Sequence, residues 1–137
     1  PLVINNTIGG MTASQDDSVQ YWVGRIQAAN ADEAIVSLGG NDAGRLKEEV
    51  YATLYPALVE IMQAFDGADV YWLIHQEGNI PALAEFRRAV MDAAAGFDNV
   101  RVMHMPLGVL GDDGVHLTPN SVGGVSNFIL KMMGYTP

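Results

Sequence analysis

Residues Ala34-Ile35-Val36-Ser37-Leu38 are followed directly by Gly39-Gly40-Asn41-Asp42. The first five residues are mostly apolar at successive positions, so both faces of a strand formed here would be buried. Strands that are apolar on both faces are typical of parallel sheets covered by helices on each side. The glycines and polar residues that follow end the apolar run. This stretch therefore predicts an α/β fold with polar groups at the carboxyl end of a buried strand.

Three further apolar runs predict strands, which gives predicted strands at 2–5, 34–38, 70–74 and 100–105. Apolar residues at helical spacing lie between these runs. Strands that alternate with helices predict a parallel sheet with right-handed crossovers. We therefore expect one domain over residues 1–137, built as a three-layer αβα sandwich with a parallel sheet.

Several local signals predict where the helices begin. Ser14 is expected to cap the first helix, and Pro56 is expected either to kink the second helical stretch or to start a new helix. Another helix is expected from about Pro81. Thr118 is expected to cap the last helix, with Pro119 in its first position.

The composition excludes several classes of function. The 7 basic and 16 acidic residues give a formal net charge of −9, which argues against a nucleic-acid partner and against binding to anionic membrane surfaces. The absence of cysteine excludes disulfides, thiolate metal sites and a cysteine nucleophile. The three histidines lack metal-ligand spacing, so we expect neither a metal site nor a cofactor.

No apolar run is long enough to span a bilayer, and no signal peptide is visible. The compartment stays open between the cytoplasm and a processed, secreted form.

An acid and a histidine lie three residues apart in Asp113-Gly114-Val115-His116, ahead of the last predicted helix. Histidine can take a proton from a hydroxyl near neutral pH, and a carboxylate can hold its ring in one tautomer. The alternative is a solvated loop in which Asp113 only stabilises the turn. Asp112 is a second possible partner for the histidine.

Two other polar segments follow predicted strands. The Asn41 amide can donate to a developing oxyanion, and the alternative is an ordinary Gly-Gly-Asn turn. The segment 5–12 contains Gly10, whose backbone N–H can act in the same way, and the alternative is a plain strand-to-helix loop. His75 ends the strand at 70–74 and either lines a substrate pocket or makes structural hydrogen bonds. In parallel sheets the ligand site lies at the carboxyl ends of the strands, where these segments are all expected.

Taken together, the three segments resemble motifs of the SGNH (GDSL-like) hydrolase family, which includes esterases, lipases, thioesterases and carbohydrate acetylesterases. Asn5 to Thr12 is similar to the family's N-x-x-I-x-G-x-T block. Gly39 to Asp42 is similar to its G-x-N-D block, and Asp113 to His116 to its D-x-x-H block. The motifs occur in the family's order, and the resemblance spans essentially the whole chain. It implies a flavodoxin-like SGNH hydrolase fold.

The resemblance also implies roles for single residues. Gly10 and Asn41 would be the donors of an oxyanion hole. His116 would be the base, and Asp113 the acid that orients it. Gly39 and His75 would support the site or line it. Asp42 is expected to shape its own turn rather than to take part in chemistry.

The family's G-D-S block, which carries the nucleophilic serine, does not occur in this sequence. None of the serines lies in a matching context: Ser37 is expected inside a strand and Ser14 at a helix cap, and no nucleophile is assigned. The chain is then expected to lack its N-terminal strand, to receive strand and serine from a partner segment, or to have lost catalysis. A sheet that lacks this strand would have an exposed defect, which favours self-association into a homo-oligomer.

The sequence thus predicts a serine ester hydrolase acting on a small-molecule, carbohydrate or lipid ester. The alternative is a catalytically inactive relative that serves as a binding or assembly module.

Overall fold

The computed structural model describes residues 12–15, 17–46 and 48–135. The predicted strand at 2–5 and the segment containing Gly10 lie outside the described residues. The described strands are β1 (Glu33–Val36), β2 (Asp69–Ile74) and β3 (Val100–His104). They form one parallel sheet in the order β1-β2-β3, with Val36 beside Trp72 and Ile74 beside His104. The expected parallel α/β organisation is confirmed for this part of the chain.

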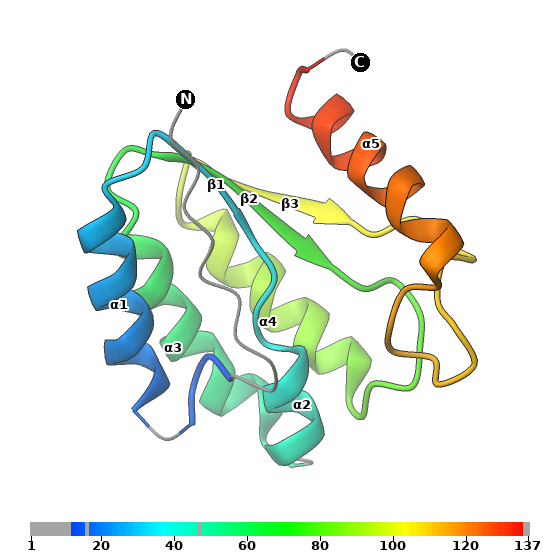
Figure 1. Ribbon diagram of the computed structural model, residues 1–137. Coiled ribbons are helices and arrows are strands. Elements are labelled where there is room, and N and C mark those ends of the chain that lie inside the picture. Colours follow the sequence, from blue (N-terminus) through cyan, green and yellow to red (C-terminus); the bar gives the residue numbers. More distant parts are fainter. Residues whose placement is uncertain (1–11, 16, 47, 136–137) are drawn as a thin grey trace.

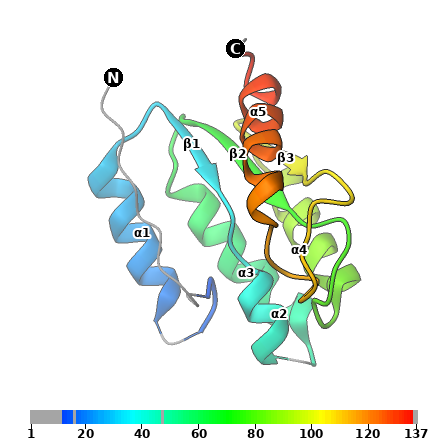
Figure 2. The ribbon, with the colours of Figure 1, turned by 45° about the vertical axis from the view of Figure 1, so that its right-hand side comes forward.

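Helices lie on both faces of the sheet. In Figure 1, α1, α3 and α4 lie on one side of the strands and α5 on the other. In the rotated view α1 lies beside β1, and α5 lies over β2 and β3 (Figure 2). The helices are α1 (Ser18–Ala29), α2 (Gly40–Leu46), α3 (Val50–Gln63), α4 (Leu83–Ala95), the 3₁₀ turn η1 (Pro119–Ser121) and α5 (Val122–Met132).

The side chains of β2 alternate between two hydrophobic cores. Val70, Trp72 and Ile74 belong to the larger core, which also contains α3 and α4 side chains. Tyr71 and Leu73 belong to the smaller core, against which α5 packs. Since successive side chains of a strand point to opposite faces, burial on both sides explains the continuous apolar run.

The strand β1 ends earlier than its apolar run predicts. Pairing with β2 stops at Val36, so Ser37 and Leu38 lie beyond the strand. The expectation that Ser37 lies inside a strand is therefore wrong. Gly39 follows with a φ of 109°, and a Cβ at this position would lie 2.8 Å from the Phe86 ring. Only glycine fits so close an approach of the chain to α4.

The helix boundaries differ in part from those expected. The helical run that starts at Gly40 stops at Leu46 and resumes at Val50. Pro56 lies inside α3, so no new helix starts there. Thr118 precedes the 3₁₀ turn η1 without a side-chain capping bond, although Pro119 does take the first position of that turn.

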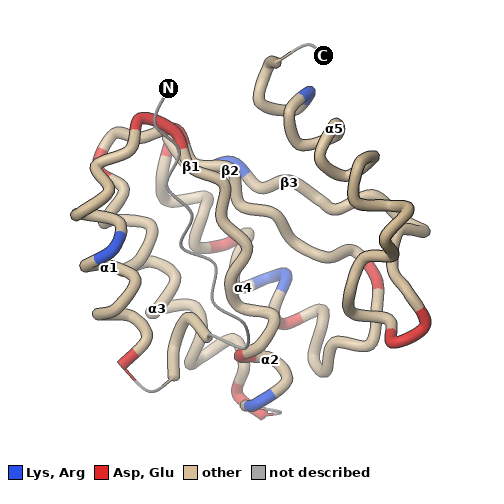
Figure 3. The backbone as a smooth tube through the Cα atoms, in the orientation of Figure 1, with Lys and Arg blue, Asp and Glu red and all other residues tan. Residues whose placement is uncertain are grey.

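Charged residues are spread over many elements (Figure 3). The described Lys and Arg side chains come from α1, α2, α4, β3 and α5. Among the described residues, no helix has both the length and the hydropathy needed to cross a membrane.

Candidate active site

The loops that follow β1, β2 and β3 meet at the carboxyl end of the sheet, which is where parallel sheets place their ligand sites (Figure 1). A cavity of about 210 Å³ lies between them. Its polar lining comes from Ser37, Asn41, His75 and His116, and its apolar wall includes Phe86. A neighbouring cavity of about 310 Å³ shares Asn41 and also borders on Arg45 and Asn79. Four of the seven predicted site residues, Gly39, Asn41, His75 and His116, thus line one cavity.

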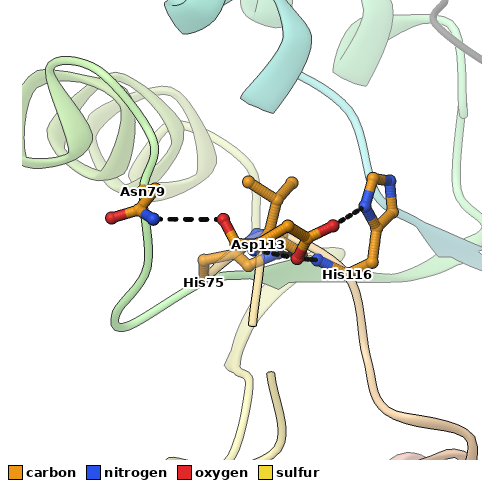
Figure 4. Close-up of polar contacts among 5 residues, drawn as sticks. His75, Asn79, Asp113 and His116 are labelled. Carbon is orange, nitrogen blue, oxygen red and sulfur yellow. Dashed lines mark hydrogen bonds and ion pairs between the residues drawn. The ribbon is translucent and has the colours of Figure 1, made fainter. Parts of the chain in front are cut away.

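Asp113 and His116 form a hydrogen-bonded pair. The distance between His116 Nδ1 and Asp113 Oδ2 is 2.6 Å (Figure 4). The other carboxylate oxygen, Oδ1, accepts the backbone N–H groups of Val115 and His116, each at 2.9 Å. An ionised carboxylate only accepts, so His116 Nδ1 carries the proton. Nε2, on the far side of the ring, is then left with its lone pair in the neutral imidazole.

Hydrogen bonds keep Asp113 ionised. The pKa of its carboxyl group is held well below the usual range, first by the His116 backbone N–H, then by the His116 ring and the Val115 N–H. The side chains of His116 and Asp113 are 83% and 53% exposed. Exposed ion pairs add little to stability because water and salt screen them. The pair therefore orients the imidazole more than it stabilises the fold, and Asp113 rather than Asp112 is the partner.

Backbone hydrogen bonds close the loop that carries this pair. The N–H of Gly111 donates to the His116 carbonyl at 2.8 Å, and the N–H of Gly114 donates to the Gly111 carbonyl at 3.0 Å. Leu110 and Leu117 form an antiparallel bridge just outside the turn. Gly114 has a φ of 69°, a conformation that side chains other than glycine's disfavour. The histidine thus projects from a turn with a fixed backbone.

His75 lines the cavity and also makes structural hydrogen bonds. Its Nε2 lies 3.2 Å from the carbonyl oxygen of Val115. Arg87 donates through Nη1 to the His75 carbonyl at 2.6 Å and through Nη2 to His104 Nδ1 at 3.2 Å. All three histidines of the chain therefore belong to one connected region around the site.

Asn79 is a site residue that the sequence analysis missed. Its backbone N–H donates to the Gly114 carbonyl at 2.8 Å, and its side-chain amide donates to the Asp113 carbonyl at 3.1 Å (Figure 4). The sequence signal for it was weak: a Gly-Asn pair, Gly78-Asn79, a few residues beyond a strand end.

Asn41 lies in the first turn of α2 and its side chain is exposed. It lines both cavities, one of them together with His116. Its amide can therefore donate to a group held beside the imidazole. Gly10, the other predicted donor, lies outside the described residues.

Asp42, next to Asn41, is fully buried. Its carboxylate accepts the backbone N–H of Ala13 at 2.8 Å and that of Ser14 at 2.7 Å, and it also accepts the Ser14 hydroxyl. Asp42 thus fastens a distant segment rather than shaping its own turn, which corrects the expectation. Ser14 does not cap α1 either, because that helix begins at Ser18 with Asp17 as its N-cap.

Ser37 is the only serine or threonine that lines either cavity among the described residues. Ser18 and Ser121 make hydrogen bonds elsewhere, with Thr12 and Thr118 respectively. The described part of the chain also contains no group of three or more His, Asp or Glu side chains placed to hold a metal ion.

No protein-family model matches this sequence, and no curated protein matches it either. The resemblance to SGNH hydrolases therefore rests on the three sequence motifs.

Proposed function

We propose that this protein is a serine ester hydrolase of the SGNH type, with a flavodoxin-like fold, in which Asp113 and His116 serve as the acid and base of a Ser-His-Asp triad. The observation that carries the proposal is the 2.6 Å hydrogen bond from His116 Nδ1 to Asp113 Oδ2, made at the carboxyl end of a parallel sheet. It fixes the tautomer in which Nε2 can accept a proton.

The reaction is acyl transfer. A serine Oγ attacks the ester carbonyl carbon while His116 Nε2 takes the hydroxyl proton. The tetrahedral intermediate then collapses, and the alcohol leaves with that proton. A water molecule next attacks the acyl-enzyme, again with His116 as base, and releases the carboxylic acid and the free serine.

The oxyanion of each tetrahedral intermediate needs hydrogen-bond donors. The Asn41 side chain borders the same cavity as His116, which supports its assignment as one donor. The Gly10 N–H is assigned as the other from the motif alone. Each donor of this kind contributes on the order of 3 kcal/mol to the transition state.

The nucleophile in this proposal is a serine that these 137 residues do not contain, supplied by an upstream or partner segment. In the family's pattern the serine of the G-D-S block lies at the end of a strand. Ser37 borders the cavity but lies two residues before the G-x-N-D segment and outside any G-D-S context, and we assign it to the cavity wall. The alternative function, a catalytically inactive binding or assembly module, is favoured by the lack of a serine in the motif context.

The test uses the protein translated from its complete reading frame. Wild type, His116→Gln and Ser37→Ala are each assayed with p-nitrophenyl acetate and butyrate and with a fluorophosphonate label. We expect turnover and labelling in the wild type and in Ser37→Ala, and the loss of both in His116→Gln. If the wild type shows neither, the hydrolase proposal fails and the binding-module alternative is favoured. If Ser37→Ala loses the label as His116→Gln does, Ser37 is the nucleophile and its assignment to the cavity wall is wrong.

A further inference from the structure

We propose that His75 and Asn79 are positioning residues that hold the Asp113–His116 turn by its backbone carbonyl oxygens. We call the hydrogen bonds from these two residues to the turn the clamp. The importance of the clamp for catalysis rests on the proposed function, whereas the hydrogen bonds themselves do not. Three successive carbonyls are held: Asn79 Nδ2 donates to that of Asp113, the Asn79 backbone N–H to that of Gly114, and His75 Nε2 to that of Val115.

The bond to Val115 also fixes the tautomer of His75. A carbonyl oxygen only accepts hydrogen bonds, so the proton of the neutral His75 ring is on Nε2. Figure 4 shows Asn79 on the side of the turn away from the His116 ring, and His75 contacts the turn at the Val115 carbonyl. The clamp therefore reaches the backbone of the turn without competing for the imidazole.

The planar trans peptide explains how a clamp on carbonyls sets the position of Asp113. In such a unit the C=O and the following N–H point in opposite directions. The unit that joins Gly114 to Val115 gives its C=O to Asn79 and its N–H to Asp113 Oδ1. The unit that joins Val115 to His116 gives its C=O to His75 and its N–H to the same Oδ1. Holding the two carbonyls therefore aims both N–H groups at the carboxylate.

The clamp is itself anchored to the sheet and to α4. Arg87 on α4 donates to the carbonyl of His75, the residue directly after β2. The same guanidinium donates to the ring of His104, the last residue of β3. Because a guanidinium only donates, this contact also makes His104 Nδ1 an acceptor. The position of the turn therefore depends, through His75 and Arg87, on the ends of β2 and β3 and on α4.

The two loops also fit each other in shape. Gly78 has a φ of 121°, and a Cβ on it would lie 2.2 Å from the Gly114 carbonyl oxygen. A Cβ on Gly114 would lie 2.7 Å from Asn79 Nδ2. A Cβ at either position would force the opposing group to move, so glycine in both loops permits the approach on which the hydrogen bonds depend.

The experiment compares His75→Ala, His75→Gln and Asn79→Asp with a matched control, Gln76→Ala. Gln76 lies in the same loop and also donates to a carbonyl, but to that of Met105 rather than to the turn. Asn79→Asp keeps the backbone N–H and replaces the side-chain donor by an acceptor facing the Asp113 carbonyl. The glutamine amide of His75→Gln can restore a donor near the position of Nε2.

The first readout is amide hydrogen exchange by NMR, which needs no nucleophile. We expect the protection of the Val115 and His116 amides to fall about tenfold in His75→Ala and Asn79→Asp, the effect of losing one net hydrogen bond. We expect it to be unchanged in Gln76→Ala and largely restored in His75→Gln. Equal protection in wild type, His75→Ala and Asn79→Asp would overturn the clamp, whether or not esters are hydrolysed.

The second readout is ester turnover by the protein from its complete reading frame. We expect kcat to fall about tenfold in His75→Ala and Asn79→Asp with KM unchanged, because the clamp orients the base and not the substrate. Should KM rise while kcat stays constant, the two residues contact substrate and the positioning role is wrong. If no variant or wild type turns over ester, the proposed function fails, while the exchange data still decide the clamp.

Discussion

The backbone N–H of Ser14 donates to Asp42 Oδ2 at 2.7 Å, although the two residues lie 28 positions apart in the sequence. The same carboxylate accepts the N–H of Ala13 and is fully buried. A buried carboxylate is tolerated only where its hydrogen bonds are satisfied, as they are here. Asp42 thus joins the first turn of α2, which carries Asn41, to the segment that follows the Gly10 motif in sequence.

We predict that Asp42→Asn lowers the free energy of unfolding by about 1–3 kcal/mol, the cost of a buried polar group without its partner. The carboxamide NH₂ would face a backbone N–H, and two donors cannot satisfy each other. Urea denaturation followed by circular dichroism measures the change. Asp66→Asn, at an exposed position in the described chain, is the control and should shift stability by less than about 0.5 kcal/mol. Equal stability of Asp42→Asn and wild type would show that the buried carboxylate is dispensable.

A second prediction concerns Gly114, whose φ of 69° and tight contact with Asn79 leave no room for a Cβ. Gly114→Ala should destabilise the protein by about 1–2 kcal/mol because a side chain disfavours this conformation. Gly24→Ala is the matched control: Gly24 lies inside α1 with open space around it, so alanine should stabilise the helix by about 0.5–1 kcal/mol. The midpoint of thermal unfolding should therefore fall in Gly114→Ala and rise in Gly24→Ala, relative to wild type. Midpoints that shift in the same direction would contradict the role given to Gly114.

The local features of the site could be predicted from the sequence, and the long-range ones could not. Asp113 and His116 are close in sequence, so one tight turn is enough to bring their side chains together. The partners of Asp42 lie on another loop, and no pattern within the G-x-N-D segment indicates them. The sequence around Ser14 predicts a helix cap, but its hydroxyl instead bonds to Asp42, which is remote in sequence and so could not be recognised as its partner.

The strands were predicted well where packing decides them and less well at their ends. Burial on both faces was expected of the run at 34–38, but Ile35 of β1 is 51% exposed, and the strand buried on both faces is β2. The run at 34–38 continues past the last residue paired with β2, because Ser37 and Leu38 already turn toward α2. Pro56 suggested a helix boundary by propensity, yet the buried face formed by Leu54, Leu58 and Ile61 carries α3 through it.

The third prediction is a pH dependence that comes from Asp113. Its pKa in the folded protein lies below the ordinary Asp value of about 3.9. The folded state therefore favours the ionised form, and the stabilisation is complete above the unfolded pKa. It is lost as the pH falls below about 4 toward the depressed folded value. The part of the stability that Asp113 contributes over Asp113→Asn should accordingly be present at about pH 5 and shrink below pH 4. Urea titrations across this range measure the difference in free energy of unfolding between the two proteins. If that difference grows as the pH falls below 4, Asp113 is not stabilised in its ionised form by the fold.

The fourth prediction concerns the tautomer of His116 and follows from the proposed hydrolase activity. In wild type the ionised Asp113 accepts from Nδ1–H, so Nε2 is free to take a proton. In Asp113→Asn the amide can present its NH₂ to the ring, which makes Nδ1 an acceptor and places the proton on Nε2. A ring protonated there cannot act as base, so kcat for p-nitrophenyl acetate should fall by about 10²–10⁴, the lower bound allowing for rotation of the amide. KM should change little, since Asp113 faces the imidazole and not the cavity.

Asp112→Asn removes the neighbouring carboxylate and should keep kcat within about twofold, because Asp112 makes no contact with the ring in the described turn. Nitrogen-15 NMR of the His116 ring reports the tautomer directly. A variant with Nε2 protonated but kcat unchanged would remove His116 from the role of base.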